Sequence, residues 1–465
     1  YASWTFRKAP KFFDVVTWTG NGVNGREIPH SLGSVPGCIF IKSTSNASAW
    51  IVYHRGLSVP TNRAIFLNTT SAEATAGYFP TTPTSTGFYL NGNGYEVNTT
   101  GQTFVAYIFA HDAGGFGDDG EQDVISCGSV VGASQQEVNL GFEPQWILLK
   151  NADSAQDWWM VDNMRGWPVQ GTDTSYSARR LNANLSSAES TLSIAPSTTG
   201  FKANTMTAGQ TYIYIAIRRP MKAPEAGTEV FNASYGGGSP YSFTAGFPVD
   251  MAIYARTNAT SPRYNWSRLW GHRLDTTTTS AQEFYNNNTW AVDSNTQTAN
   301  GWGANDFAWM FKRAPGFMDV VCYTGTGVAK TEAHNLGVVP ELMIVKNRSS
   351  GGTAWPVYSA TIGASSAMYL QLTNGAFAPT AVFWNNTAPT SSVFTISTSG
   401  FVNTSSNTYI AYLFATLAGV SKVGSYTGTG ANLNIDCGFS AGARFILIKR
   451  TDSTGDWYVW DSARG

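Results

Sequence analysis

Asp14-Val-Val-Thr-Trp-Thr-Gly20 is the stretch that decides the fold, because it returns almost unchanged as Asp319-Val-Val-Cys-Tyr-Thr-Gly325. Both copies are short, rich in β-branched and aromatic residues, and end on glycine, which is typical of a β-strand that leads into a turn. Weaker copies begin at Asp123, Glu229 and Lys422, at intervals of 90 to 109 residues. This spacing predicts a tandem repeat of about 100 residues.

A second element recurs in every copy: an apolar run that ends in a basic residue, as in Cys38-Ile-Phe-Ile-Lys42. The other copies are Trp146–Lys150, Ala252–Arg256, Leu342–Lys346 and Phe445–Lys449. We expect a central strand here, with the ammonium group reaching water at the strand end. A tryptophan follows shortly after each run, at Trp50, Trp158, Trp266, Trp355 and Trp457. We expect core packing within each repeat for these indoles, in preference to a ladder that stacks on sugars.

The composition favours an all-β chain. Charged residues make up 13% and aromatic residues 14%, and there are 47 glycines, the opposite of the balance that disorder requires. The first repeat contains eight candidate strands, near 14–19, 26–30, 38–43, 49–54, 64–68, 87–91, 95–98 and 103–110. We therefore predict a tandem array of β-sandwich domains of about 100 residues, either jelly-roll-like or immunoglobulin-like.

Longer matches set the order of the repeats. Phe6–Asp14 matches Phe311–Asp319, and Lys150–Trp158 matches Lys449–Trp457, so the order is A-B-C-A-B. The predicted divisions are 1–10 (closing strand of a preceding C-type repeat), 11–116 (first A-type), 117–223 (first B-type), 224–315 (C-type), 316–420 (second A-type) and 421–465 (first half of a second B-type). Because each repeat can enclose a core, we expect separate beads joined by short linkers.

Charge, hydropathy and cysteine placement argue against nucleic-acid binding, membrane insertion and disulfide bonds. The net charge is −1, which gives no general attraction to nucleic acid, and the apolar runs are too short for membrane insertion. Cysteines occupy non-equivalent positions in their repeats, so we expect isolated thiols and no disulfide. The cysteines are Cys38, Cys127, Cys322 and Cys437.

Candidate catalytic and metal-binding residues fit structural roles better. Asp157 and Asp162 lie five positions apart, so on one strand they point to opposite faces and cannot act as an acid and base on one bond. The Gly-rich acidic segment 114–123 could offer oxygen ligands to Ca²⁺, but it lacks an EF-hand spacing and is expected to be a solvated hinge. His30 and His334 match without a second metal ligand. We expect no enzyme activity and no cofactor.

Loops that differ between the repeats are the more plausible places for ligand contacts, because recognition usually sits in loops on a rigid scaffold. The loop aromatic residues that we single out for binding are Trp167, Tyr176, Tyr264, Trp270, Trp290 and Trp384.

Three segments carry a resemblance: His30–Pro36, His334–Ser349 and Tyr426–Gly430. They resemble tandem repeats in large virion structural, tail-fibre-like proteins of marine tailed phages, cyanophages especially. The resemblance implies a β-sandwich repeat in a fibre on the virion surface. Its partners would be other copies of the chain, other virion proteins and host-surface glycans. The alternatives are a bacterial extracellular adhesin or surface fibre and, ranked lower, a polysaccharide-degrading tail spike.

The half-repeats at 1–10 and 421–465 generate the first prediction. A lone closing strand exposes unpaired N–H and C=O groups, and half a sandwich leaves Phe445–Ile448 facing water. We expect the native polypeptide to continue at both ends, with C-type sequence before Tyr1 and B-type sequence after Gly465. The reading frame and the intact mass check this, and a natural product of 50.1 kDa would contradict it.

Overall fold

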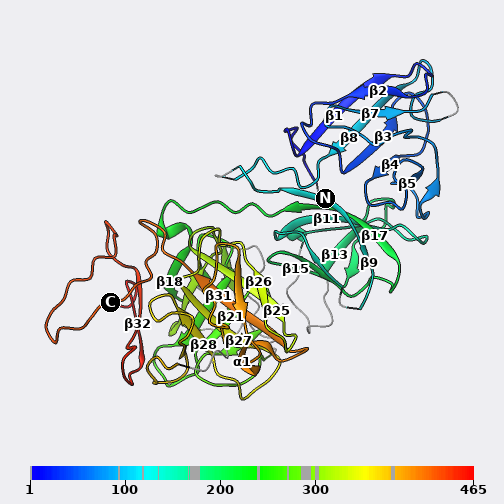
Figure 1. Ribbon diagram of the computed structural model, residues 1–465. Helices are drawn as coiled ribbons and strands as arrows, with labels where there is room; N and C mark the ends of the chain where they lie inside the picture. Colours follow the sequence, from blue (N-terminus) through cyan, green and yellow to red (C-terminus); the bar gives the residue numbers. More distant parts are fainter. Residues whose placement is uncertain are drawn as a thin grey trace. The chain divides into compact units, whose positions relative to one another are not determined.

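The computed structural model describes residues 3–92, 95–117, 120–134, 136–165, 167, 178–237, 241–269, 272–283, 295–298, 303–378 and 383–465 (Figure 1). The prediction of an all-β chain is confirmed. Antiparallel strands make up the regular secondary structure of these ranges, apart from the single turn α1 (Gly400–Asn403) and the 3-10 turns η1 (Asn163–Arg165) and η2 (Gly227–Glu229). No helix within these ranges is long and apolar enough to cross a membrane.

The first A-type repeat consists of a large sheet and a small sheet. The large sheet has the order β1 (Phe13–Thr19), β8 (Thr103–Phe109), β3 (Cys38–Ser43), β4 (Ile51–His54), β5 (Arg63–Phe66) and β6 (Ala74–Thr75). The small sheet pairs β2 (Arg26–Pro29) with β7 (Gly87–Leu90). The apolar run β3 is central, as predicted. The predicted strand at 95–98 does not form, whereas the short β6 was not predicted.

The first B-type repeat has the same strand order. Its large sheet runs β9 (Ile125–Val131), β17 (Thr211–Arg218), β11 (Pro144–Asn151), β12 (Trp159–Asp162), β13 (Ala178–Asn182) and β14 (Ser190–Leu192). Its small sheet runs β10 (Gln136–Asn139), β16 (Gly200–Ala203) and β15 (Ile194–Ser197). In both repeats the first strand of the repeat pairs with the last one, which then pairs with the central apolar strand.

The later repeats keep this order. In the C-type repeat the large sheet is β18 (Phe231–Tyr235), β24 (Asp306–Phe311), β20 (Met251–Arg256), β21 (Tyr264–Ser267) and β22 (Arg273–Asp275), with β19 (Ser242–Thr244) paired to β23 (Thr296–Thr298). The second A-type repeat has β25 (Met318–Thr324), β31 (Thr408–Phe414), β27 (Leu342–Asn347), β28 (Pro356–Ser359) and β29 (Met368–Tyr369), with β26 (Lys330–Ala333) paired to β30 (Val393–Ile396). The half-repeat contributes the hairpin β32 (Phe445–Lys449) and β33 (Trp457–Asp461).

The stretch that recurs in both A-type repeats forms a strand of the large sheet, and in the first repeat its Trp18 side chain packs against Phe88 of the small sheet. In β1, the ring of Trp18 stacks on Phe104 at 5.4 Å, and its indole N–H donates to the Val97 carbonyl at 3.2 Å. The glycine that ends the stretch is required, because a Cβ on Gly20 would lie 1.9 Å from the Thr99 carbonyl oxygen. The backbone at Gly20 therefore approaches the backbone at Thr99 more closely than any side chain would allow.

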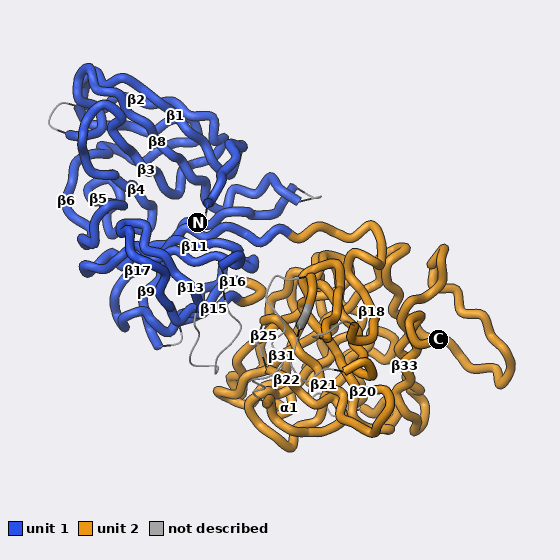
Figure 2. Tube along the Cα trace, turned by 180° about the vertical axis from the view of Figure 1, so that it is seen from behind, with its two compact units in different colours: residues 1–167, 174–196, 200–220 blue, residues 168–173, 197–199, 221–465 orange. Residues whose placement is uncertain are grey.

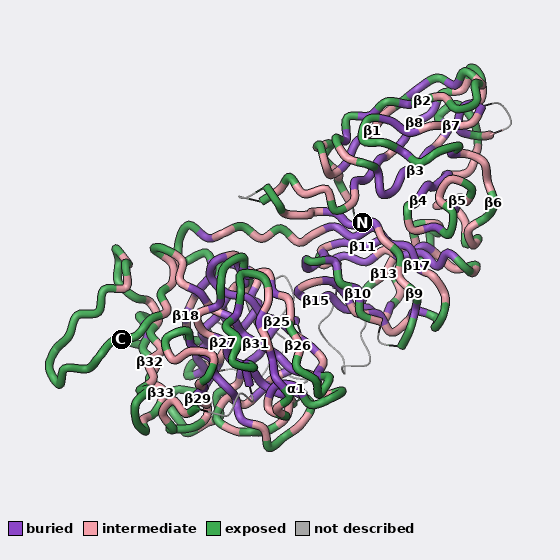
Figure 3. Tube along the Cα trace, viewed as in Figure 1, coloured by how far each residue is buried: buried purple, intermediate pink, exposed green. Residues whose placement is uncertain are grey.

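The chain comprises two compact units, coloured separately in Figure 2. Unit 1 comprises residues 1–167, 174–196 and 200–220, and unit 2 comprises 168–173, 197–199 and 221–465. Each unit holds more than one repeat. In unit 1 a single apolar cluster includes Phe40 of the first repeat and Leu148 of the second, and buried stretches run along both large sheets (Figure 3). The expectation of separate beads is therefore wrong within each unit.

All four cysteines are free in the structure. Cys38 lies on β3 and Cys127 on β9, and both are buried in the cluster that the first two repeats share. Burial raises the pKa of the Cys38 thiol well above its usual value, so this group stays protonated and unreactive at neutral pH.

The aspartate that opens each A-type stretch gives a matched pair for mutation. Asp319 accepts from the backbone N–H groups of Val320 and Asn335, and its carboxylate pairs with the buried Arg313 at 2.6 Å. Asp14 makes the equivalent backbone bonds, but its partner Lys8 is 57% exposed. Asp319→Ala should lower the free energy of unfolding of unit 2 by about 3–5 kcal/mol, because it leaves a buried guanidinium without this carboxylate.

Asp14→Ala is the control, and it should cost unit 1 clearly less because the Lys8 ammonium returns to water. Chemical denaturation followed separately in the two units measures both changes. Equal losses for the two variants would contradict this account.

Candidate assembly interfaces

A lysine and a tryptophan face each other across the central strands of four of the five repeats. The register of β32 and β33 places Lys449 directly opposite Trp457. Continuing the registers of β3–β4, β11–β12 and β27–β28 by one or two residues gives the pairs Lys42–Trp50, Lys150–Trp158 and Lys346–Trp355.

The C-type repeat departs from this pattern. Its register sets Tyr254 opposite Tyr264, which places Pro262 opposite Arg256. Trp266 instead pairs with Ala252 and lies in the repeat's own core cluster. The tryptophan that follows the apolar run of this copy therefore does not occupy the position of the other four, because the loop between the two strands is longer.

In unit 1, the lysine–tryptophan pair of the B-type repeat binds the A-type repeat that precedes it. The indole N–H of Trp158 donates to the Phe66 carbonyl at 2.9 Å. The ammonium of Lys150 donates to the Thr70 carbonyl at 3.1 Å. It also donates to the carbonyls of Asn151, the last residue of β11, at 2.7 Å and of Ser154 in the following loop at 3.4 Å. The acceptors Phe66 and Thr70 lie at the end of β5 and in the turn that follows it.

In unit 2 the same contact forms where the second A-type repeat meets the C-type repeat. Trp355 donates to the Thr278 carbonyl at 3.1 Å, and Lys346 donates to the neighbouring Thr279 carbonyl, also at 3.1 Å. Lys346 adds a bond to the Thr353 carbonyl of its own loop at 2.6 Å, and its ammonium lies 5.7 Å from the centre of the Trp355 ring. The receiving carbonyls again lie in the turn after the fifth strand of the preceding large sheet.

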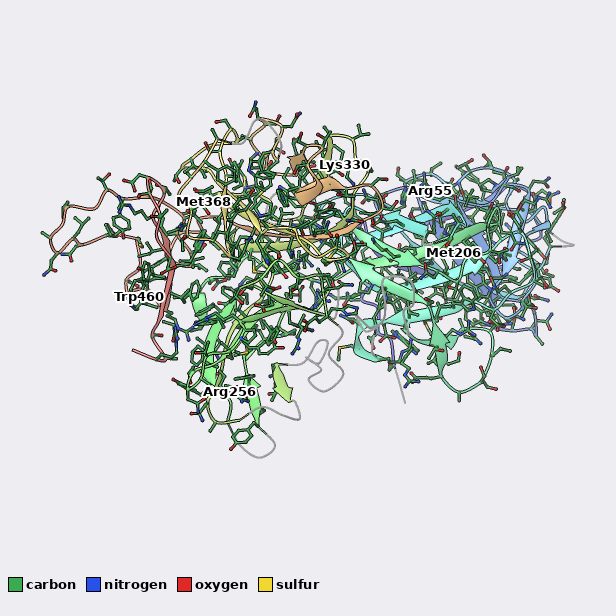
Figure 4. The ribbon with its side chains drawn as sticks, turned by 90° about the horizontal axis from the view of Figure 1, so that it is seen from below. Arg55, Met206, Arg256, Lys330, Met368 and Trp460 are labelled. Atoms are coloured by element: carbon green, nitrogen blue, oxygen red, sulfur yellow. The ribbon has the colours of Figure 1, made fainter. Side chains whose placement is uncertain are left out.

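The hairpin of the half-repeat repeats the arrangement on the second A-type repeat. Trp457 donates to the Tyr369 carbonyl at 3.0 Å, and Lys449 donates to the Thr373 carbonyl at 2.8 Å. Trp460, labelled in Figure 4, lies on the same hairpin and is 48% exposed. Three junctions within the two units therefore use one pair of side chains in one geometry.

These contacts correct two expectations. Lys150 and Lys346 do not reach water: both are buried, and burial lowers the pKa of each ammonium to about 8. Trp158 and Trp355 are buried, 2% and 1% exposed, but the surface that covers them belongs to the preceding repeat as well as to their own. The tryptophans therefore join repeats.

Apolar packing surrounds each pair. We call the side of a large sheet that points away from its small sheet the outer face. In unit 1, Leu148, Ile213 and Ile215 on the outer face of the B-type repeat belong to the same cluster as the buried strands of the A-type repeat. At its margin, buried His54 of β4 hydrogen-bonds to the Tyr214 carbonyl at 3.0 Å, and burial lowers the His54 pKa to about 4. This histidine is therefore neutral at physiological pH.

A second contact ties the segment that precedes the first A-type repeat to the B-type repeat. The predicted closing strand at 1–10 does not form over the described residues 3–8. Trp4 donates to the Asp162 carboxylate at 3.1 Å, and Arg165 pairs with the same oxygen at 2.5 Å while lying 5.2 Å from the centre of the Trp4 ring. Unit 2 holds a close counterpart. There, Trp309 donates to Asp461 at 3.1 Å, and Arg464 pairs with Asp461 at 2.6 Å.

Asp157 and Asp162, the pair considered for acid–base chemistry, each have a different structural role. Asp162 holds the tryptophan and arginine of the second contact. Asp157 accepts from the side-chain amides of Asn182 at 3.2 Å and Asn184 at 2.9 Å, which braces the turn after β13.

The predicted loop aromatic residues fall into three groups. Trp167 and Trp384 are each 1% exposed and belong to the core clusters of their repeats, so the expectation that they contact a ligand from a loop is corrected. Tyr264 is half-buried on β21. Its ring is tilted by 35° against that of Tyr254 at 5.5 Å, and the Arg273 guanidinium lies 3.9 Å from its ring centre. Tyr176, Trp270 and Trp290 lie outside the described residues.

The two matched histidines have structural roles, as expected. The Nε2 atom of His30 bonds to the Thr84 carbonyl at 3.2 Å, and its Nδ1 accepts from the Leu32 N–H at 3.2 Å. His334 makes the same two bonds. Within the described ranges, no group of three or more His, Cys, Asp or Glu side chains could hold a metal ion. Asp118 and Asp119 of the acidic segment lie outside those ranges.

A family of known protein domains matches most of the chain. The family described as "Domain of unknown function (DUF7483)" matches residues 8–220 and 267–465. The first stretch spans the first A-type and B-type repeats, and the second runs from the end of β21 in the C-type repeat to the final hairpin. No curated protein matches the chain.

The two tryptophans Trp158 and Trp50 provide a direct test of the junction. Trp158→Ala should lower the free energy of unfolding of unit 1 by about 3–5 kcal/mol, because it empties a buried site between two repeats. Trp50→Ala should cost markedly less, because Trp50 is only half-buried. Denaturant titration of each variant measures the difference, and a larger loss for Trp50→Ala would refute the assignment.

The buried lysines predict a specific pH dependence. The Lys150 pKa is about 8 in the folded state and about 10.4 when unfolded, so between these values the unfolded chain binds more protons. Stability contributed by this site should therefore rise with pH from 8 to 10. Lys150→Met lacks the group and serves as the reference for all other titrations. If the stability difference between the two proteins stays constant over this interval, the ammonium is not desolvated as described.

Proposed function

The chain belongs to the DUF7483 family of domains of unknown function, and from the way its repeats interlock we propose that it is a non-enzymatic structural repeat protein that acts as a stiff spacer in a phage virion appendage, such as a tail fibre. The observation that carries the proposal is the lysine–tryptophan contact. It recurs at three junctions and joins repeats of unlike type: B-type on A-type in unit 1, and A-type on C-type and B-type on A-type in unit 2.

The chemistry of the junction supports a spacer. The receiving groups are backbone carbonyls, so the turn can vary from Phe66–Thr70 to Tyr369–Thr373 without losing the acceptors. Such a junction depends on the fold of the partner more than on its sequence, which suits an array that grows by duplication. The apolar outer face removes free rotation between neighbours, and this limits bending.

The surroundings follow from the resemblance to virion proteins. We place the protein on the virion surface, with other copies of itself or other virion proteins as partners. Within the described ranges, Tyr264 on β21, with its Arg273 neighbour, is the aromatic residue of the predicted set that could meet a host-surface glycan. Aromatic faces bordered by a cation and polar groups are suited to sugar rings.

Proteomics of purified virions tests the location. Peptides from the repeats should copurify with density-banded particles in a constant ratio to the major structural proteins. Recovery only from a bacterial cell surface would favour an adhesin instead. A glycan-release assay on host polysaccharide should show no products above a boiled control, and release of oligosaccharides would overturn the non-enzymatic assignment.

A further inference from the structure

The outer face of the first A-type repeat is only partly covered. Val15, Trp50, Val105 and Tyr107 lie together on this face, and each is half-buried. The rings of Trp50 and Tyr107 stack at 6.1 Å with 23° between their planes. These side chains form a continuous apolar surface, which we call the open face.

The second A-type repeat shows the same surface in a covered state. Its equivalent residues are Val320, Trp355, Ile410 and Tyr412, and each is at most 2% exposed. The two repeats share sequence, strand order and register at this place, so their burial differs because of what lies against them.

The cover in unit 2 is the C-type repeat. Tyr412 donates its hydroxyl to Asn265 of β21, and Leu269 and Leu274 of the C-type repeat join Ile410 and Tyr412 in one apolar cluster. The turn after β22 supplies the two carbonyls that receive Trp355 and Lys346. The covering surface thus offers an amide, an apolar patch and a threonine-rich turn.

Lys42 of the open face makes the same hydrogen bond within its own loop as Lys346 makes in the second A-type repeat. Lys42 donates to the Ser48 carbonyl of its own loop at 2.6 Å, as Lys346 does to Thr353. What differs is the second acceptor, which in unit 2 comes from the neighbouring repeat. The Trp355 indole N–H donates to the Thr278 carbonyl of that neighbouring repeat, and Trp50 occupies the equivalent position on the open face.

We propose that the open face is a docking site for a C-type repeat, whose threonine-rich turn accepts hydrogen bonds from Lys42 and Trp50 and whose β21 amide meets the Tyr107 hydroxyl. The C-type repeat at 224–315 already covers the second A-type repeat, so the occupant is a further repeat of this type. The docking site rests on the proposed spacer function. Its test measures only folding and contact between repeats, so the result does not depend on whether the protein is found on virions.

The experiment extends the chain by duplication. A second copy of residues 221–305 is fused to the amino group of Tyr1, so that Tyr1–Phe6 takes the place of Asp306–Phe311 and completes a C-type repeat in register. Hydroxyl-radical footprinting then compares Trp50 and Tyr107 with Trp355 and Tyr412, which are internal references in the same molecule. We expect the reactivity of Trp50 and Tyr107 to fall about tenfold, to the level of the references.

The control is the same extension with Asn265→Leu and Leu274→Asp in the added copy alone, which should leave Trp50 and Tyr107 as reactive as in the unextended chain. Unchanged reactivity in the unmodified extension would overturn the proposal. An added repeat that stays unfolded beside the intact open face would also overturn it, because residues 224–315 fold against the equivalent face in unit 2.

Two measurements on the unextended chain exclude other occupants. Sedimentation from 1 to 100 µM should show one mass, and protection of Trp50 with rising concentration would instead make the open face a contact between copies. Oligosaccharides, represented by maltohexaose and chitohexaose, should leave Trp50 and Tyr107 unprotected. Protection by either sugar would replace the docking site with a glycan site.

Discussion

The organisation of this protein depends on the need to cover the outer face of each large sheet. Every complete repeat pairs a large sheet of five or six strands with a small sheet of two or three, which covers only one side of it. Apolar residues such as Ile215 and Tyr412 occupy the other side and are buried against the preceding repeat. The free energy of burying this surface joins the repeats, because it is gained only when two neighbours fold together.

The lysine–tryptophan pair fixes how neighbouring repeats are aligned within this apolar packing. A buried ammonium is costly unless its protons are bonded, and Lys150 finds enough carbonyl oxygens only when the Thr70 turn is in place. The indole of Trp158 adds a large flat surface and one donor that reaches the Phe66 carbonyl. Together they select one register between neighbours. The C-type repeat lacks the pair, because Pro262 takes the place opposite Arg256 there.

The strands were predictable from sequence because β-branched and aromatic residues in short runs bounded by glycine report local structure directly. The central position of β3 followed from its continuous apolar character. The burial of Lys150 and Trp158 against another repeat was not predictable. Alternation with a period of two assigns a side chain to one face of the sheet, but it does not show whether water or a neighbouring repeat covers that face. Spacing alone also misplaced Trp266, because a longer loop shifts its register by several residues. The repeated Asp162–Arg165 spacing was the available signal for the second contact, but spacing does not show which tryptophan lies beside it.

The central claim is that neighbouring repeats fold as one interlocked body, and native-state hydrogen exchange tests it most directly. Phe201 is fully buried in the core of the B-type repeat, away from the junction, so Phe201→Ala destabilises that repeat alone if repeats are independent. The interlocked account predicts that amides of β4 and β5 in the A-type repeat exchange faster in the variant, in step with those of β11. Unchanged protection of β4 and β5, with β11 exchanging freely, would contradict it.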